Sequence, residues 1–373
     1  MPTFDPHDAK DAGRIKPTIM AIHCFIPAHN EQSQIADSIA SLQTQSLKPD
    51  FITVIADNCS DNTVEISQDG GAEVFVSVDN DAKKAGALNQ VLDQVLPDLD
   101  DEDIILIMDA DTVLGPAFVK TAVDTFAANS SAGVCSATFF ARPPQGILEL
   151  CQANEYARYA RSLARRGYRP YVASGTASAF RAKALKQVKS ERGAKLPYHG
   201  GGVYDTHSLT EDNEITLALL CLGWELTSVR TADASSTTDV MPTAKMLYRQ
   251  RLRWYLGAIV NLFSYGTKLP RKYRYVYWGQ QIGLFASLLG TILYLTYLIW
   301  SVLIGASLTL DSPWSAVLGI TLVERTVSVW RFSNWKGRLL ALTILPEMVY
   351  ALGLLGIYGV AVSKYPFNKK GSW

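Results

Sequence analysis

Two long apolar runs near the end of the chain constrain its fold more than any other feature. The segment Val276–Leu310 contains no charged residue, and Leu339–Ser363 contains only Glu347. Each run is longer than the roughly 20 apolar residues with which an α-helix crosses the hydrocarbon core of a bilayer. The basic segment Arg271–Arg274 precedes the first run, where a cytoplasmic flank is expected. The sequence therefore predicts a membrane domain at residues 275–373.

Composition and charge argue against several other classes of protein. The 373 residues are enough for about two domains. The 35 Lys and Arg balance the 35 Asp and Glu, so we expect no nucleic-acid partner. Residues 1–17 form a polar tail without the apolar stretch of a secretory signal. The five cysteines show no C-x-x-C spacing, which is typical of core residues in a reduced compartment and not of disulfides or zinc ligands.

From Ile19 onward, short β-rich runs alternate with segments of helical periodicity. We expect strands at Ile19–Ile26, Phe51–Ala56, Glu73–Ser77, Ile104–Met108 and Gly133–Ser136, and helices at Glu31–Gln43, Asn62–Gln68, Lys83–Val95 and Pro116–Ala128. This alternation predicts an α/β fold with βαβ units and a Rossmann-like, mostly parallel sheet. Right-handed crossovers place the strand ends along one edge. Polar residues gather at three of these ends, Pro27–Glu31, Asp57–Asp61 and Asp109–Asp111.

Two further helices are expected beyond this region, at Gln145–Arg166 and Leu209–Leu222. Thr210 is the predicted N-cap of the second one, and Glu211 and Asp212 stand in its first turn. Because the helix dipole favours negative charge at this end, we expect it to lower the pKa of Asp212.

The pair Asp109 and Asp111 directly follows the apolar strand Ile104–Met108. In an open α/β sheet, ligands bind at the carboxyl ends of the strands. Two carboxylates at this position suit Mg²⁺ or Mn²⁺ carrying a diphosphate. Taken alone, such a pair is also compatible with a solvated turn, so other motifs must decide between the two interpretations.

Those motifs occur in one order between Phe25 and Gly257. They are Pro27-Ala28-His29-Asn30-Glu31, Asp57-Asn58-Cys59-Ser60-Asp61, Lys84-Ala85-Gly86-Ala87-Leu88-Asn89, Asp109-Ala110-Asp111, Gly175-Thr176 with Phe180, Thr210-Glu211-Asp212, and Gln250-Arg251-Leu252-Arg253-Trp254. In this order, and with apolar runs after them, they resemble the membrane-bound family 2 glycosyltransferases, which are related to cellulose, chitin and hyaluronan synthases. The resemblance implies a GT-A fold.

The resemblance also implies which residues hold the nucleotide of a sugar donor. His29 and Glu31 would stand at the edge where the base lies, although capping of the following helix is the alternative role for Glu31. Asp57 would bind the uracil or the ribose, with capping of the helix from Asn62 as its alternative. Lys84 would contact the nucleotide.

The remaining implied roles concern the metal and the reaction. Asp111 would bind Mn²⁺ or Mg²⁺ directly, whereas Asp109 would bind the metal and partly face the ribose. Asp212 would be the general base that takes the proton of the acceptor hydroxyl. Glu211 beside it would contact the acceptor.

Gln250, Arg253 and Trp254 fall at positions i, i+3 and i+4, so a helix presents them on one face. Arg253 is suited to bind a phosphate of the donor, and Gln250 would bind the donor beside it. The ring of Trp254 offers a flat surface to an acceptor sugar. A membrane-interface position is the alternative for Trp254. Arg251 is expected on another face, next to lipid headgroups.

The membrane domain is smaller than in polymer-extruding synthases. Val276–Leu310 is long enough for one tilted helix, and Leu339–Ser363 for a second, which Pro346-Glu347 interrupts. Pro313–Trp330 carries Glu324 and Arg325, so it either returns through the membrane or lies at its surface. A polymer channel within one chain is therefore not expected, and a channel formed between the chains of a homo-oligomer stays open.

Together these observations predict a GT-A domain at residues 18–240, an interfacial helix region at 241–274, and the membrane domain with two or three spans. We expect a multi-pass membrane enzyme with a cytoplasmic catalytic domain. It would transfer a hexose or N-acetylhexosamine, with inversion, from a nucleotide diphosphate sugar (UDP being the expected nucleotide) to a saccharide. Single-step transfer to a lipid-linked or protein acceptor is one alternative, and an inactive nucleotide-sugar-binding scaffold is another.

Overall fold

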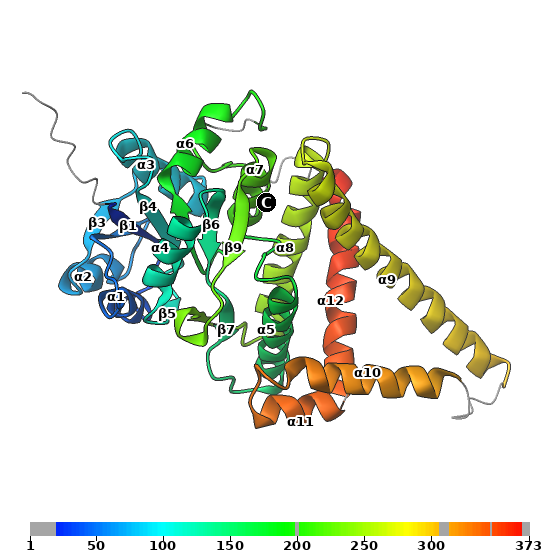
Figure 1. Ribbon diagram of the computed structural model, residues 1–373. Coiled ribbons are helices and arrows are strands. Elements are labelled where there is room, and N and C mark those ends of the chain that lie inside the picture. Colours follow the sequence, from blue (N-terminus) through cyan, green and yellow to red (C-terminus); the bar gives the residue numbers. More distant parts are fainter. Residues whose placement is uncertain (1–19, 198–200, 306–312, 344, 368–373) are drawn as a thin grey trace, which may run out of the picture.

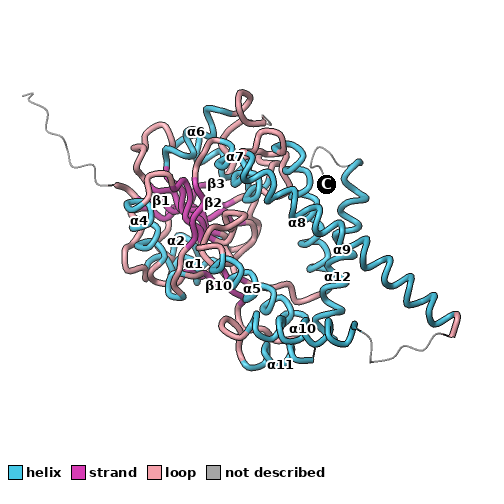
Figure 2. Tube along the Cα trace, turned by 45° about the vertical axis from the view of Figure 1, so that its right-hand side comes forward, coloured by secondary structure: helices cyan, strands magenta, loops and turns pink. Residues whose placement is uncertain are grey.

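The computed structural model describes residues 20–197, 201–305, 313–343 and 345–367. The predicted polar tail at residues 1–17 lies outside the described residues. An α/β domain occupies one side of the molecule, and the helices α8 to α12 occupy the other (Figure 1). Figure 2 shows the strands gathered at the centre of the α/β domain with helices around them.

The main sheet has seven strands in the order β3-β2-β1-β4-β8-β6-β9. Their bounds are β1 Ile22–Ala28, β2 Phe51–Ala56, β3 Glu73–Val76, β4 Ile104–Met108, β6 Ala132–Ser136, β8 Ala177–Arg181 and β9 Glu225–Ser228. All five predicted strands are confirmed, whereas β8 and β9 were not foreseen. The sheet is mostly parallel, as expected, but β8 runs antiparallel to both β4 and β6. It therefore begins at the edge where its neighbours end.

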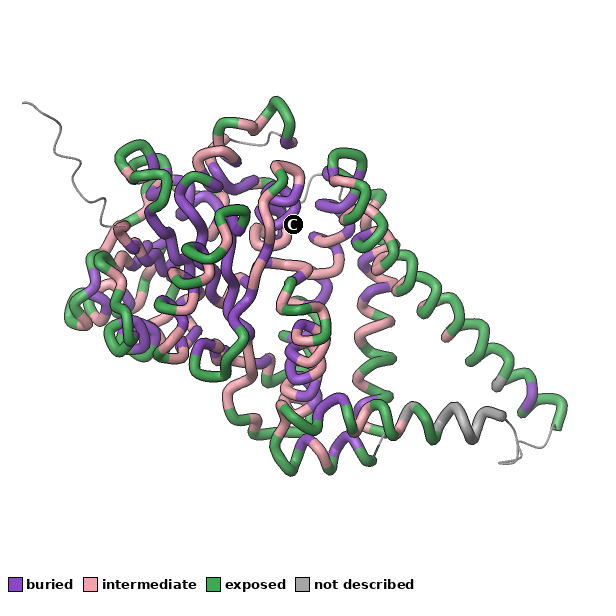
Figure 3. The backbone as a smooth tube through the Cα atoms, viewed as in Figure 1, coloured by how far each residue is buried: buried purple, intermediate pink, exposed green. Residues whose placement is uncertain are grey.

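Helices cover both faces of this sheet. They are α1 Ile35–Gln43, α2 Thr63–Asp69, α3 Lys83–Val95, α4 Phe118–Ala128, α6 Ala182–Glu191 and α7 Glu211–Cys221. A further helix, α5 Ile147–Arg165, makes most of its contacts outside this sheet. The central strand β4 sends Ile105 and Ile107 into the core on one face and Ile104, Leu106 and Met108 into the core on the other. A strand that is apolar at every position is what burial on both faces requires, and Figure 3 shows the buried strands.

A second sheet of three short strands lies beside the first, in the order β5-β10-β7. The strands are β5 Val113–Leu114, β7 Phe139–Ala141 and β10 Ser236–Thr238, and the short helix η1 Ala232–Ala234 precedes β10. Because β5 follows Asp111 closely and pairs with β10, this sheet carries the residues around Thr238 to the end of β4.

The remaining helices are α8 Ala244–Tyr265, α9 Arg271–Leu303, α10 Pro313–Val329, α11 Trp335–Thr343 and α12 Leu345–Lys364, followed by the short helix η2 Tyr365–Phe367. α8 lies between the α/β domain and α12 (Figure 1). The C-terminal half of α9 diverges from α12. α9 confirms the expectation of a single helix from Val276 as far as Leu303, and residues 306–310 of the expected segment lie outside the described residues. The second predicted span, Leu339–Ser363, is divided between α11 and α12, close to the foreseen break at Pro346-Glu347.

Among the described residues, two helical segments are long and apolar enough to cross a membrane, Arg271–Leu303 and Leu345–Phe367. Their most apolar stretches of 18 residues have mean hydropathies of 2.0 and 1.6, and the stretch in the first segment is 0% buried within the molecule. Figure 3 shows α9 exposed along most of its length. Pro313–Val329 forms the helix α10, which is not one of the two segments that are long and apolar enough to cross a membrane.

Glu347 in the first turn of α12 is 1% exposed and joins three helices. Its Oε1 accepts hydrogen bonds from Asn154 Nδ2 at 2.8 Å and from Arg158 Nη2 at 2.7 Å, both of α5. Its Oε2 accepts one from Arg325 Nε of α10 at 3.0 Å. Two arginines and an amide thus compensate the buried carboxylate, and they fasten the apolar helices to the α/β domain.

Candidate active site

The antiparallel strand β8 brings Gly175 to the end of β4, where the N–H of Asp109 donates to the carbonyl oxygen of Thr176 at 3.0 Å. Gly175 lies between two carboxylates. A Cβ placed on it would be 3.3 Å from Oδ2 of Asp212 and 3.6 Å from Oδ2 of Asp109. The absence of a side chain therefore lets the first turn of α7 face the end of β4 across a narrow gap.

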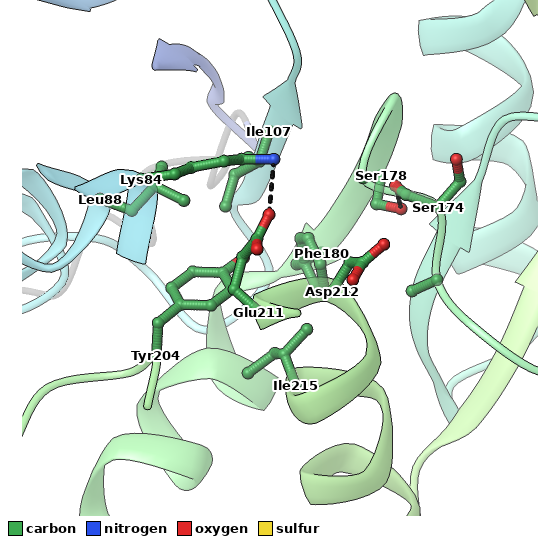
Figure 4. A pocket seen from close by; sticks show the side chains of 12 residues that line it. Lys84, Leu88, Ile107, Ser174, Ser178, Phe180, Tyr204, Glu211, Asp212 and Ile215 are labelled. Atoms are coloured by element: carbon green, nitrogen blue, oxygen red, sulfur yellow. Dashed lines mark hydrogen bonds and ion pairs between the residues drawn. The ribbon is translucent and has the colours of Figure 1, made fainter. Parts of the chain in front are cut away.

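Lys84, in the first turn of α3, joins the same two elements. Its Nζ lies 2.6 Å from Oδ1 of Asp109 and 2.9 Å from Oε1 of Glu211, and Figure 4 shows the second of these pairs. Burial opposes the charge of Lys84, but the two carboxylates raise its pKa well above the ordinary value. Burial likewise opposes the charge of Glu211, yet Lys84 and Arg253 lower its pKa. Lys84 thus forms ion pairs with both Asp109 and Glu211, and each pair stabilises the charged form of its members.

Asp212 is half-buried and points away from Lys84, toward Ser174 (Figure 4). Its Oδ1 accepts a hydrogen bond from the N–H of Asn213 at 2.7 Å. Burial, followed by the negative charge of Glu211, raises its pKa to about 6. The predicted lowering by the helix dipole is therefore wrong, because the loss of hydration and a neighbouring carboxylate outweigh the dipole.

Asp111 lies on the other side of Asp109, next to the small sheet. Its Oδ2 accepts a hydrogen bond from Thr238 Oγ1 at 3.4 Å. Burial and the charges of Asp109 and Asp239 raise its pKa to about 6. Glu31 follows β1 at the same edge of the sheet, and burial and the charges of Asp111 and Asp109 raise its pKa to about 6 as well. Carboxylates that gather in this way create a strongly negative edge.

At this edge of the sheet, Asp109 and Asp111 could provide two carboxylate ligands to a divalent cation. Asp109 and Asp111 both line one cavity and offer the hard oxygen atoms that Mg²⁺ and Mn²⁺ prefer. Among the described residues, no group of three or more His, Cys, Asp or Glu side chains is arranged to hold a metal ion. The two aspartates therefore suit an ion that takes its other ligands from a bound diphosphate and water, which is how Mg²⁺ is usually held.

The predicted nucleotide residues lie at the ends of β1 and β2. Nδ1 of His29 is 2.7 Å from the carbonyl oxygen of Asp57. Oδ1 of the buried Asp57 accepts hydrogen bonds from Ser77 Oγ at 2.6 Å and Asn80 Nδ2 at 2.8 Å. The alternative of helix capping by Asp57 is wrong, because Asp61 accepts the hydrogen bond of the Thr63 N–H instead. The Asp57 side chain is held by this network beside the strand ends.

The helix α8 forms the opposite wall of the cavity. Gln250, Arg253 and Trp254 all line it, as one helix face would. Nη1 of Arg253 donates to the carbonyl oxygen of Leu209 at 3.3 Å, which ties α8 to the loop before α7. Oε1 of Gln250 is buried and has no hydrogen-bond partner among the described residues.

The expectation that Arg251 lies next to lipid headgroups is wrong. Arg251 is buried, with Nη2 at 3.0 Å from Oε2 of Glu155 in α5. Its guanidinium also lies over the ring of Trp254, 4.3 Å from the ring centroid. Arg251 lines the cavity beside Trp254 and holds its ring by a cation–π contact that the sequence pattern did not indicate.

The cavity has a volume of about 1190 Å³ and contains Asp109, Asp111, Glu211 and Asp212 together. Six aromatic residues line it as well, namely Phe139, Tyr156, Tyr159, Tyr171, Trp254 and Tyr255. Of these, only Trp254 was predicted to belong to the site. The spacing of Tyr156 and Tyr159 places them on one face of α5, but periodicity alone does not tell which helix face meets a cavity. Such residues become recognisable only once α5 is placed against α8.

An α/β sheet with a half-buried carboxylate opposite an Asp-x-Asp pair is the arrangement of the GT-A glycosyltransferases, whose fold this chain shares. Residues 104–354 match the family described as "Glycosyl transferase family group 2". Because this match covers more than half of the chain, the protein belongs to that family and is a nucleotide-sugar-dependent glycosyltransferase. No curated protein matches the sequence of the chain.

A solved structure shows the same fold. The chain is similar to a mannosyltransferase from Pyrobaculum calidifontis in complex with GDP-Man and Mn²⁺, with 17% identity, a TM-score of 0.59, and coverage of 95% of this chain and 89% of that one. A glucosyl-3-phosphoglycerate synthase from Mycobacterium tuberculosis, in complex with Mn²⁺, UDP and glucosyl-3-phosphoglycerate, matches 67% of this chain and 81% of its own at 18% identity, with a TM-score of 0.44. At these identities the likeness concerns the fold alone.

Proposed function

We propose that this enzyme is an inverting, metal-dependent hexosyltransferase acting at the cytoplasmic face of a membrane. It transfers a hexose or N-acetylhexosamine from a nucleotide diphosphate sugar to the hydroxyl of a saccharide. One observation carries the proposal: the carboxylates of Asp109 and Asp212 face each other across Gly175 and line a single cavity. A diphosphate held at the first would present its sugar to the second.

The donor end comprises the residues at the sheet edge. Asp57, His29 and Glu31 receive the nucleoside, and UDP is the nucleotide that we expect there. A GDP-linked donor is the alternative, because the mannosyltransferase of similar fold holds GDP-Man. Lys84 lies 2.6 Å from Asp109 and brings a positive charge to the place where the phosphates would lie. Gln250 and Arg253 approach from α8, and Arg253 would donate to a phosphate oxygen.

Asp109 and Asp111 would hold Mn²⁺ or Mg²⁺, which the mannosyltransferase of similar fold also binds as Mn²⁺. When bound, such an ion supplies Lewis-acid stabilisation of the leaving diphosphate. The chain's own contribution is to gather two carboxylates at the end of β4 and to balance them with Lys84.

Asp212 acts as the general base. Its carboxylate takes the proton of an acceptor hydroxyl while that oxygen forms a bond to the anomeric carbon of the donor sugar. The bond from this carbon to the diphosphate oxygen breaks, and its electron pair leaves with the diphosphate. Attack from the face opposite the leaving group inverts the anomeric centre. A pKa raised to about 6 makes Asp212 a stronger base than an ordinary aspartate.

The acceptor end lies between α5 and α8. Trp254 would stack on the acceptor sugar, and Arg251 holds its ring. Glu211 would contact the acceptor once a bound donor draws Lys84 away from it. The apolar helices α9 and α12 support a membrane location, because their exposed faces are apolar. An inactive scaffold is not favoured, because the proposed base and the metal pair line one cavity.

The test uses the full chain purified in detergent with a panel of UDP- and GDP-linked sugars, Mn²⁺ or Mg²⁺, and saccharide acceptors. We expect release of the nucleotide and a product heavier by one sugar or a ladder of sugars. Asp212→Asn should lower the transfer rate by about 10²–10⁴-fold, whereas the surface variant Asp124→Asn should not change it. Failure of every donor to be consumed, or an Asp212→Asn variant as fast as the wild type, would overturn the proposal.

A further inference from the structure

The end of the cavity away from the sheet is built by an apolar helix. Gln281 and Leu284 of α9 line the same cavity as Asp111 and Asp212. The site of sugar transfer is therefore continuous with the surface from which α9 projects. A binding site for a water-soluble acceptor would not need a wall made from such a helix.

The middle of the cavity is lined by aromatic rings that are fixed in place. Phe139 stacks on Tyr159 with the ring centroids 5.1 Å apart, and it meets the edge of Tyr156 at 4.9 Å. Trp254 stands on the opposite wall, and the guanidinium of Arg251 packs on its ring. Rings held in this way offer flat apolar faces to a sugar, next to the carboxylate of Asp212.

Beyond Leu284, α9 is mostly apolar and largely exposed, although Leu288 still packs against the cluster of α8 and α12. Phe285, Leu289, Ile292 and Leu293 are each at least 50% exposed, and no charged residue occurs between Val276 and Leu310. On its cavity side, the polar Gln281 is held by Tyr358 of α12, whose OH lies 3.1 Å from the Gln281 carbonyl oxygen. Along α9 the lining of the cavity thus changes from the polar Gln281 to the apolar Leu284.

We propose that the acceptor is an amphiphile, an inference that rests on the proposed function. Its sugar headgroup lies between the aromatic residues, with one hydroxyl at Asp212, and its apolar tail leaves the cavity past Leu284 along α9. The chemical class of the acceptor follows from the groups that line the cavity. Carboxylates at one end suit a hydroxyl, aromatic faces in the middle suit a sugar ring, and aliphatic groups at the exit suit an apolar tail. The tail then continues into the lipid that covers the exposed faces of α9.

The experiment compares methyl and dodecyl glycosides that carry the same sugar. The full chain in detergent receives its donor, and kcat/KM is measured for both acceptors below the micelle concentration of the dodecyl glycoside. We expect a kcat/KM at least tenfold higher for the dodecyl glycoside, which corresponds to about 1.4 kcal/mol. Equal values for the two acceptors would overturn the inference.

A matched pair of variants separates binding at the exit from simple enrichment of dodecyl chains in detergent. Leu284→Trp narrows the exit, whereas Leu289→Trp places the same side chain on α9 at a position that does not line the cavity. We expect the ratio of the two kcat/KM values to fall at least fivefold in Leu284→Trp and to persist in Leu289→Trp. A ratio that persists in both variants would mean enrichment alone and would contradict the inference.

Failure of the inference is distinguishable from failure of the proposed function. Donor consumption is recorded in every reaction, including one without acceptor. If the enzyme transfers sugar equally well to methyl and dodecyl glycosides, only the amphiphilic acceptor is excluded. If no donor is consumed with any acceptor, the proposed function itself fails.

Discussion

The Nζ atom of Lys84 lies 2.6 Å from Oδ1 of Asp109, so that a cation from α3 stands between the end of β4 and the start of α7. Its second contact, at 2.9 Å, is with Glu211. Because the same region holds Asp111 and Asp212, Lys84 offsets part of the repulsion among four carboxylates. Its charge therefore influences both the binding of the donor and the protonation of the proposed base.

Replacement of this cation should change the rate and its pH dependence together. We expect Lys84→Met to lower kcat/KM by about 100-fold, as loss of one preorganised charge-stabilising group does in other enzymes. Lys84 holds the pKa of Asp212 down, so the acidic limb of the pH profile should also move to higher pH. Profiles of kcat/KM for the variant and for the exposed control Lys120→Met provide the measurement. If the acidic limb of the pH profile did not move, Lys84 would not influence the pKa of Asp212, and the prediction would be contradicted.

The wild-type pH profile itself tests the proposed base. Asp212 has a pKa raised to about 6, and only its deprotonated form accepts a proton. Transfer should therefore be constant above pH 7 and fall about tenfold for each pH unit below the apparent pKa. Steady-state rates between pH 4.5 and 8 in one mixed buffer, approximately constant in ionic strength, give this curve. A rate that stays constant down to about pH 4.5 would contradict a base in this environment.

Removal of divalent cations should stop the reaction. We expect EDTA to abolish transfer and an excess of Mn²⁺ or Mg²⁺ to restore it, since the carboxylates of Asp109 and Asp111 repel a diphosphate unless a divalent cation lies between them. Asp111→Asn should weaken Mn²⁺ binding in the presence of UDP or GDP by at least about 10-fold, measured by Mn²⁺ electron paramagnetic resonance. The exposed Asp233→Asn serves as the control. Full activity in EDTA would exclude the metal site.

A different prediction concerns the junction between α5, α10 and α12. Glu347 is 1% exposed and pairs with Arg158 and Arg325. Glu347→Ala leaves two arginines without their partner, and we expect the free energy of unfolding to fall by about 3 kcal/mol. Asp124→Ala, which breaks the exposed pair with Lys120, should change it by less than about 0.5 kcal/mol. Denaturant unfolding in detergent measures both, and equal effects would contradict a structural role for Glu347.

Local patterns predicted much of the α/β domain. The strands Phe51–Ala56 and Ile104–Met108 and the helix Lys83–Val95 have the expected bounds, because uninterrupted apolar runs and helical periodicity are properties of short segments. The strand β8 escaped prediction, since Ala177–Arg181 is short and mixed in polarity. Its antiparallel pairing with β4 depends on contacts between residues far apart in the chain.

The sequence by itself determined that the chain has an α/β domain, an ordered set of glycosyltransferase motifs and long apolar helices, because each of these resides in consecutive residues. The tertiary structure alone decided the raised pKa of Asp212, the pairing of Arg251 with Glu155 and the continuity of the cavity with α9. The physical reason is that burial, ion pairing and cavity shape depend on which distant segments meet. Neither helix periodicity nor the helix dipole contains that information.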